Sequence, residues 1–428
     1  MSAELEAGTE ERGRAGGMFR SLSHRNFRLF WAGAFLSNVG TWMQAVAQGW
    51  LVLQLTDSEF WLGFDGFMAT VPGLALTLLA GVFADLVDRR RLLMFTQIGA
   101  GLSSLILGTL IYTGVVNSSV DIWIILLLSF ATGCCFALAG PSYQAITIDL
   151  VGREDLSNAI ALNSTQFQLS RVVGPVFAGL GLKVFGLAGC FFANALSFVA
   201  VIISLRLVRY EKEKGALQPS PTHSASDSRA VWKDLKEGLR YVGGRPRVLI
   251  LLIISGLTSL FGAPYMSLVP VFARDILHVG ETGLAMMSGM SGAGAFLGAL
   301  LLTFMGNFRH KGWSVLGGAF VFSLCLIGFA LSTRLYVSLA FIFGMGLAIV
   351  SCVAVINMLL QQLVTDEMRG RVMSMFILSF IGTMPIGNLI AGSAAERFGA
   401  PRTLAAGGFI IAVSIALIAA RNKRLREL

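Results

Sequence analysis

The chain has 428 residues, of which 55% are hydrophobic and only 13% are charged, and its net charge is +9. This composition excludes an ordinary soluble globular domain. Apolar runs of about 20 residues recur along the chain, and each is long enough to cross the hydrocarbon core of a membrane as a helix. The alternating ten-residue segments of a membrane β-barrel do not occur. We therefore expect a polytopic, all-α membrane protein.

The apolar runs predict twelve transmembrane helices. A polar tail, 1–26, precedes them, and it has no apolar core typical of a cleavable signal peptide. The expected spans are 27–53, 60–84, 92–113, 121–147, 158–185, 187–208, 247–273, 281–305, 312–332, 335–363, 370–398 and 401–420.

The basic residues predict the orientation, because lysine and arginine are enriched in cytoplasmic loops. With a cytoplasmic N-terminus, 27 of the 33 lysines and arginines fall in cytoplasmic segments or at the cytoplasmic ends of spans, including the basic tail 421–428. Five fall in outside loops or at the outside ends of spans, and Arg171 lies deep within a span. We expect both termini in the cytoplasm and the chain in the cytoplasmic (inner) membrane. The positive charge then reflects topology and not nucleic-acid binding.

The longest polar stretch, 209–246, separates two predicted six-helix bundles, 27–208 and 247–420. It begins as a Pro/Ser-rich linker and continues as "VWKDLKEGLRYV", whose apolar residues share one helix face. This segment predicts an amphipathic helix on the cytoplasmic leaflet, and a solvated connector helix is the alternative.

The two bundles look like a repeat. A shift of 213 residues aligns Gly174 with Gly387 and Phe185-Gly186 with Phe398-Gly399 without a gap. Repeated halves are typical of alternating-access transporters, whose substrate site lies between the halves near the membrane midplane.

The loop "GVFADLVDRRR", 81–91, resembles the signature loop of the major facilitator superfamily. The resemblance implies that Asp85 contacts the N-terminus of the eleventh span near Gly370 and that Arg89 pairs with Asp149. A carboxylate is favourable at a positive helix end. The alternative is a loop that only marks topology. The corresponding loop of the second half, 306–312, has no acid, so the latch would be one-sided. Its predicted residues are Gly81, Asp85, Arg89, Arg90 and Asp149.

The stretch 149–186 indicates which members of the superfamily the chain resembles. Gly174-Pro175 followed by Ala178-Gly179 resembles the antiporter motif of exporting members of the superfamily, so Gly174, Pro175 and Gly179 are its predicted residues. "NAIALNS", "EGLRYV" and "RGRVMSM" resemble the branch of enterobactin exporters and of macrolide and tetracycline efflux pumps. Many proton-coupled exporters carry an arginine in the fourth span, and 121–147 has none. Either coupling runs through other residues, or this protein is not a proton antiporter of that type.

Asp65 and Arg171 are the two ionisable residues placed clearly within predicted spans, and an intramembrane charge indicates function. Burial favours the protonated form of a carboxylate, which makes Asp65 the candidate proton carrier. The alternative for Asp65 is an acid at the membrane interface, and the alternative for Arg171 is a purely structural role. The predicted cavity and coupling residues are Asp65, Arg171, Asn163, Phe167, Asn38, Trp42, Asn357 and Gln361.

Three functional classes compete. No Gly-Lys pair and no His-Glu-x-x-His motif occur, which argues against an ATP-driven pump or a metalloenzyme. Neither the four histidines nor the five cysteines suggest a metal site, and we expect no cofactor. The sequence favours a monomeric secondary exporter of small amphipathic molecules, driven by protons. An importer or symporter on the same fold is the alternative.

Overall fold

A computed structural model describes residues 19–86, 88–152, 154–208, 228–306 and 308–422, with only the backbone of 77–86 and 228–235. The longer helices end where glycine, proline or polar residues interrupt the apolar runs. The elements are η1 (Arg20–Ser23), α2 (Arg25–Thr56), α3 (Glu59–Leu86), α4 (Arg89–Tyr112), η2 (Ser119–Asp121), α5 (Ile122–Val151), α6 (Leu156–Leu207), α7 (Ser228–Gly243), α8 (Pro246–Leu257), η3 (Thr258–Gly262), α9 (Tyr265–Val271), η4 (Phe272–Ile276), α10 (Gly280–Met305), α11 (Lys311–Leu331), α12 (Leu335–Leu363), α13 (Asp366–Phe380), α14 (Met384–Phe398) and α15 (Ala400–Arg421).

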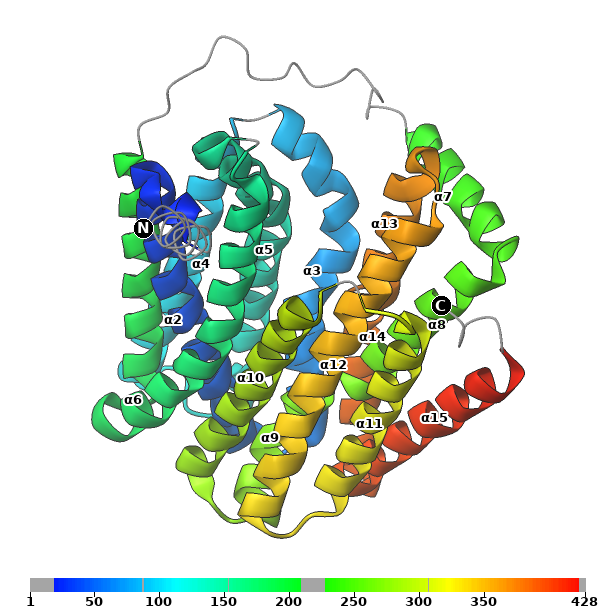
Figure 1. Ribbon diagram of the computed structural model, residues 1–428. Helices are drawn as coiled ribbons and strands as arrows, with labels where there is room; N and C mark the ends of the chain where they lie inside the picture. Colours follow the sequence, from blue (N-terminus) through cyan, green and yellow to red (C-terminus); the bar gives the residue numbers. More distant parts are fainter. Residues whose placement is uncertain (1–18, 87, 153, 209–227, 307, 423–428) are drawn as a thin grey trace, which may run out of the picture.

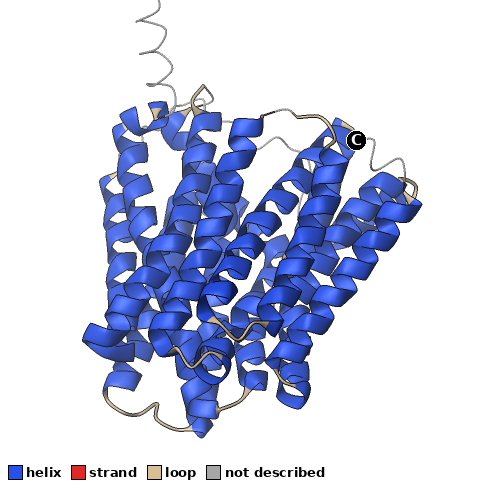
Figure 2. Ribbon diagram, turned by 60° about the horizontal axis from the view of Figure 1, so that its bottom comes forward, coloured by secondary structure: helices blue, strands red, loops and turns tan. Residues whose placement is uncertain are grey.

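These elements confirm the prediction of twelve transmembrane helices. α6 contains two spans, because its backbone breaks at Gly186. Elements α8 to η4 form one broken span, 246–276, and α13 with α14 forms another, 366–398. Figure 2 shows helices throughout the part of the chain that the structure describes, and no strand.

The repeat predicted from the sequence has a structural counterpart. Gly186 and Gly399, which a 213-residue shift aligns, both have positive φ, +67° and +85°. Each turns the chain sharply between two spans, where a side chain would be strained. Gly174 and Gly387 also match, since each brings its helix against the backbone of the first span of its own half, at Val39 and Leu260.

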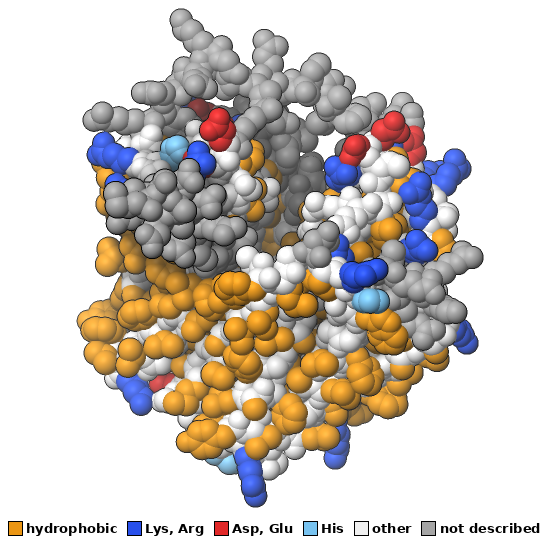
Figure 3. Space-filling model, viewed as in Figure 1, with side chains coloured by type: hydrophobic (Ala, Val, Ile, Leu, Met, Phe, Trp, Pro, Cys, Tyr) orange, Lys and Arg blue, Asp and Glu red, His pale blue; other side chains and the backbone are white. Residues whose placement is uncertain are grey.

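The helices form two groups that meet along two seams (Figure 1). α2 to α6 pack together, as do α8 to α15; between the groups, α3 packs against α14 and α6 against α10. Figure 3 shows apolar side chains in a broad band across the molecule. We call the end that carries α7 the α7 face and the other end the opposite face (Figure 1).

Part of the predicted latch lies at the α7 face. Arg89 and Asp149 are 3.8 Å apart, and Arg90 donates a hydrogen bond to the carbonyl of Arg206 at 3.1 Å. Gly81 and Asp85 belong to α3, but their side chains lie outside the described part of the chain. Their contact with the eleventh span stays a prediction.

The predicted amphipathic helix forms as α7, which packs against α13. Glu237 pairs with Arg371 at 2.8 Å, and a Cβ at Gly238 would lie 3.2 Å from the sulfur of Met375. The described part of α7 therefore packs against the second group of helices. Residues 209–227 and both chain tails, 1–18 and 423–428, lie outside the described residues.

Candidate transport cavity

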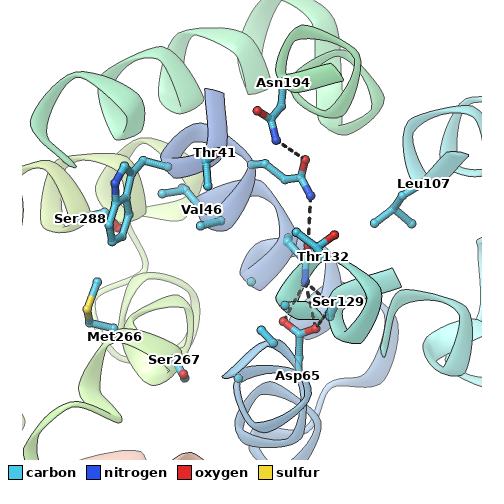
Figure 4. A pocket seen from close by; sticks show the side chains of 18 of the residues that line it. Thr41, Val46, Asp65, Leu107, Ser129, Thr132, Asn194, Met266, Ser267 and Ser288 are labelled. Carbon is cyan, nitrogen blue, oxygen red and sulfur yellow. Dashed lines mark hydrogen bonds between the residues drawn. The ribbon is translucent and has the colours of Figure 1, made fainter. Parts of the chain in front are cut away.

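A cavity of about 280 Å³ lies between the two groups of helices. α2 to α6 supply most of its wall, and α9 and α10 supply the rest. In Figure 4, Asp65 and Ser129 lie on one side of it, and Met266, Ser267 and Ser288 lie on the other. Its position between the halves is the one expected for the substrate site of an alternating-access transporter.

Asp65 faces this cavity from α3 and is held by neutral donors. Gln48 donates through Nε2 to both carboxylate oxygens, at 2.9 and 3.0 Å, and Ser129 donates to Oδ1 at 2.6 Å. No described lysine, arginine or histidine forms an ion pair with Asp65. A carboxylate without a cationic partner can gain or lose a proton without breaking an ion pair.

The hydrogen bonds continue from Gln48 along α2 and on to α4 and α6, and Figure 4 shows the branch that ends at Asn194. Gln44 donates to Gln48 at 3.5 Å and accepts from Ser104 at 2.7 Å and from Asn194 at 2.6 Å. α2, α4 and α6 are thereby tied to the site of Asp65. In a low-dielectric interior such a network orients its members, because each unpaired group would be costly.

Arg171 reaches the same cavity from α6. Its guanidinium lies over the ring of Trp42, 5.2 Å from the centroid, and donates a long hydrogen bond to Gln168 at 3.5 Å. Its Nε is buried and has no partner among the described residues. The cavity thus carries one guanidinium without an acidic partner among them, beside an aromatic face.

The predicted antiporter motif brings three helices close together. A Cβ at Gly174 would lie 2.8 Å from the carbonyl oxygen of Val39 in α2, and a Cβ at Gly179 would lie 2.8 Å from the Cβ of Ala285 in α10. Pro175 lies between them and lines the cavity. The small residues therefore let α6 pack closely against α2 of its own half and α10 of the other half.

The structure divides the predicted cavity residues into three sets. Asp65, Trp42 and Arg171 line the transport cavity, whereas Asn38, Asn163 and Phe167 line a second cavity inside the first group of helices. Asn357 and Gln361 line neither cavity, and Gln361 donates to Asn357 at 2.5 Å.

Gln44, Gln48, Ser129 and Asn194 were not among the predicted site residues. A search for ionisable groups passes over neutral polar side chains. The signal that could have found two of them is an amide pair four residues apart, Gln44 and Gln48, in an apolar span.

Twelve helices in two related halves, with a cavity at their interface, define a transporter of the major facilitator superfamily. The chain belongs to the family of that superfamily described as transmembrane secretion effectors, whose pattern matches residues 16–428. It is a multi-pass membrane transporter and not an enzyme.

Its relatives include transporters of siderophores and of drugs. The chain is 25% identical to the staphyloferrin A transporter of Staphylococcus aureus, over 88% of this chain and 91% of that protein. It is 23% identical to macrolide efflux protein A of Streptococcus pyogenes, over 94% and 97% of the two chains. It is 25% identical to the enterobactin exporter of Escherichia coli, over 95% and 94%.

A solved structure shows the same fold. It is a bacterial homologue of the human lysosomal transporter Spinster, in an inward-facing and unoccupied conformation. The TM-score is 0.71 at 15% identity, over 94% of this chain and 97% of that one. At this identity the likeness concerns the fold alone.

Proposed function

We propose that this transporter exports small amphipathic molecules across the cytoplasmic membrane in exchange for protons. The observation that carries the proposal is Asp65, a carboxylate held by Gln48 and Ser129 in the cavity between the halves and without a cationic partner among the described residues. Proton coupling needs a group whose charge differs between the two states of alternating access, and Asp65 can supply it.

Arg171 and Trp42 indicate the chemistry of the transported molecule. A guanidinium keeps its positive charge and attracts an anionic group, while the aromatic ring and the apolar wall of the cavity accept an apolar body. The siderophore and the drug class named for two relatives support a small-molecule substrate.

The direction rests on the exporters and efflux proteins among the relatives and on the Gly174-Pro175 motif. In this proposal both termini and the α7 face are cytoplasmic. Cysteines placed at Phe60 and Gly280, in a background without native cysteines, should then react with an impermeant thiol reagent only from outside. Labelling of either position from the cytoplasm would overturn the orientation.

Everted membrane vesicles with an imposed pH gradient test direction and coupling together. Staphyloferrin A, enterobactin and a macrolide form the first panel of substrates. We expect gradient-driven uptake into the vesicles, which corresponds to export from the cell. Asp65→Asn should abolish the gradient-driven part and spare substrate binding, and Asp121→Asn, an exposed carboxylate at the start of α5, is the matched control.

Asp65→Asn vesicles that pump normally against a gradient would make Asp65 structural and place coupling elsewhere. Uptake into vesicles of the opposite orientation would favour the alternative, an importer or symporter on this fold.

A further inference from the structure

The second cavity, of about 230 Å³, has no role in the function proposed above. It lies inside the first group of helices, between α2, α4, α5 and α6. Asn38 precedes Trp42 by one turn of α2, and Asn163 precedes Arg171 by about two turns of α6. Both helices begin at the α7 face (Figure 1), so the second cavity lies nearer that face than the transport cavity does.

Asn163 lines this cavity and has an unsatisfied acceptor. Thr147 donates its hydroxyl hydrogen to the carbonyl of Tyr143 at 3.0 Å, so its oxygen can only accept from Asn163 Nδ2, at 3.1 Å. This arrangement fixes the orientation of the amide. Oδ1 of Asn163 is then buried without a hydrogen-bond partner among the described residues.

Gln166 lines the same cavity and has an unsatisfied donor. Gln166 is 1% exposed, and its Oε1 accepts a long hydrogen bond from the hydroxyl of Tyr143, at 3.5 Å. Nε2 has no partner among the described residues. A buried polar atom left unpaired costs about 1–3 kcal/mol, so both atoms favour a ligand that satisfies them.

The rest of the lining is uncharged and combines aromatic rings with small apolar and neutral polar residues. Phe30, Phe136, Tyr143 and Phe167 contribute rings, and no Lys, Arg, Asp, Glu or His lines the cavity. The volume is several times the roughly 30 Å³ that one water molecule occupies. The ligand that fits this cavity best is a neutral, flat ring system with one hydrogen-bond donor and one acceptor.

The two cavities are neighbours. Phe136 lines both, and Phe167 in the second cavity packs edge-on against Trp42 in the first, with ring centroids 6.0 Å apart. We propose that the second cavity is a subsite for a neutral aromatic part of the transported molecule. Its donor binds Asn163 Oδ1, and its acceptor binds Gln166 Nε2. The inference rests on the proposed function in one respect, that the ligand is the transported molecule.

Binding to the purified full-length protein in detergent tests the subsite. The probe is 2-naphthamide, a fluorescent neutral ring with N–H donors and a carbonyl acceptor. We expect Gln166→Met and Asn163→Leu each to weaken its binding about tenfold, as for the loss of one hydrogen bond to a desolvated partner. 2-Ethylnaphthalene, which has neither group, should bind both variants as well as it binds the wild type.

Gln361→Met is the matched control, since this amide lines neither cavity. Each variant removes an unsatisfied polar atom and also one hydrogen bond, with Tyr143 in Gln166→Met and with Thr147 in Asn163→Leu, so the melting temperatures should fall only slightly. Unchanged 2-naphthamide affinity in both variants, or an equal loss in Gln361→Met, overturns the subsite.

A second probe separates the two cavities. The anion 2-naphthoate should lose affinity in Arg171→Gln and keep it in Gln166→Met, and 2-naphthamide should show the reverse. The reverse pattern, or equal losses for both probes, counts against a separate subsite. These measurements need no gradient, so a failure of proton-coupled export would leave their outcome standing.

Discussion

The two ends of the molecule differ in how the halves meet. At the opposite face, Arg274 of η4 pairs with Asp57 and donates to the carbonyl of Leu53 at 3.0 Å. Glu396 of α14 accepts from the hydroxyl of Ser58 at 2.8 Å and from the backbone N–H of Phe60 at 3.1 Å. These contacts all cross from one half to the other, and the last lies at the positive end of α3.

At the α7 face, the described ion pairs stay within one half. Arg89 pairs with Asp149 in the first half, and Arg371 pairs with Glu237 in the second. The contacts between α6 and α10 are also concentrated away from the α7 face. The close ones begin at Gln168 and continue along α6 to Gly179, nearer the opposite face.

The difference indicates a conformer that is closed at the opposite face. Alternating access requires these cross-half contacts to break while new ones form at the α7 face. Because the two conformers differ by only a few kcal/mol, single side chains at either end can shift the balance.

Among changes to the contacts at the two ends, the largest effect is expected from Gly392→Leu. A Cβ at Gly392 would lie 2.8 Å from Gly63 Cα and 3.0 Å from the carbonyl oxygen of Glu59, and backbone atoms cannot move aside as a side chain can. Overpacking of about 1–3 kcal/mol should keep this end from closing and lower transport about tenfold. The measurements are the efflux rate and the distance between spin labels at Val120 and Tyr336, which are exposed residues.

The control for this variant is Gly317→Leu, because a Cβ at Gly317 meets no atom within 4 Å. The label distance should lengthen in Gly392→Leu and stay unchanged in Gly317→Leu. An unchanged distance in Gly392→Leu would show that the close approach of α3 and α14 does not hold this end shut.

Asp85→Asn tests the predicted latch at the α7 face. If Asp85 binds the start of the eleventh span when this face closes, its loss should remove about 1 kcal/mol from that conformer. Transport should fall about fivefold, with normal folding and membrane insertion. Export normalised to the amount of protein in the membrane measures this, and a normal rate would reduce the loop to a marker of topology.

Arg274→Gln should have a smaller effect. The side chain of Asp57 is 81% exposed, so its ion pair contributes little, and the hydrogen bond to Leu53 contributes most of about 1 kcal/mol. We expect a roughly fivefold shift toward the conformer open at the opposite face, but only about a twofold change in transport. The same spin-label pair reports the shift.

Asp57→Asn is the comparison for that variant, and it should shift the conformers less than Arg274→Gln. The same shift in both would show that the ion pair, and not the hydrogen bond to the carbonyl, closes this end.

Arg89→Gln should have the smallest effect. The pair with Asp149 is 3.8 Å long and joins two partly exposed side chains of one half, so it contributes about 0–1 kcal/mol. Transport should stay within about twofold of the wild type. A loss as large as that of Asp85→Asn would mean that Arg89 and Asp149 take part in closing the α7 face.

The sequence predicted most of the fold, because a membrane leaves few choices for an apolar chain. Every backbone group in the hydrocarbon must be paired within its own segment, so the apolar runs became helices at nearly the predicted bounds. The internal repeat was also readable, since Gly186 and Gly399 occupy turns that favour glycine for the same reason. The breaks inside the spans were not predicted, among them the π-helical turns η3 and η4.

The candidate site was only partly readable. Asp65 and Arg171 stood out because a charge in an apolar span is rare, and both line the transport cavity. The amide pair Asn357 and Gln361 stood out for the same kind of reason, yet it lines neither cavity.

The sequence by itself determined the helices, the two related halves and which residues are unusual for a span. These properties depend on local composition and on spacing along one helix. Only the tertiary structure decided which unusual residues share a space: Gln48 and Ser129 with Asp65, Trp42 with Arg171, and Asn163 in a separate cavity. The rotation and crossing of packed helices set those distances, and they arise from contacts between residues far apart in the chain.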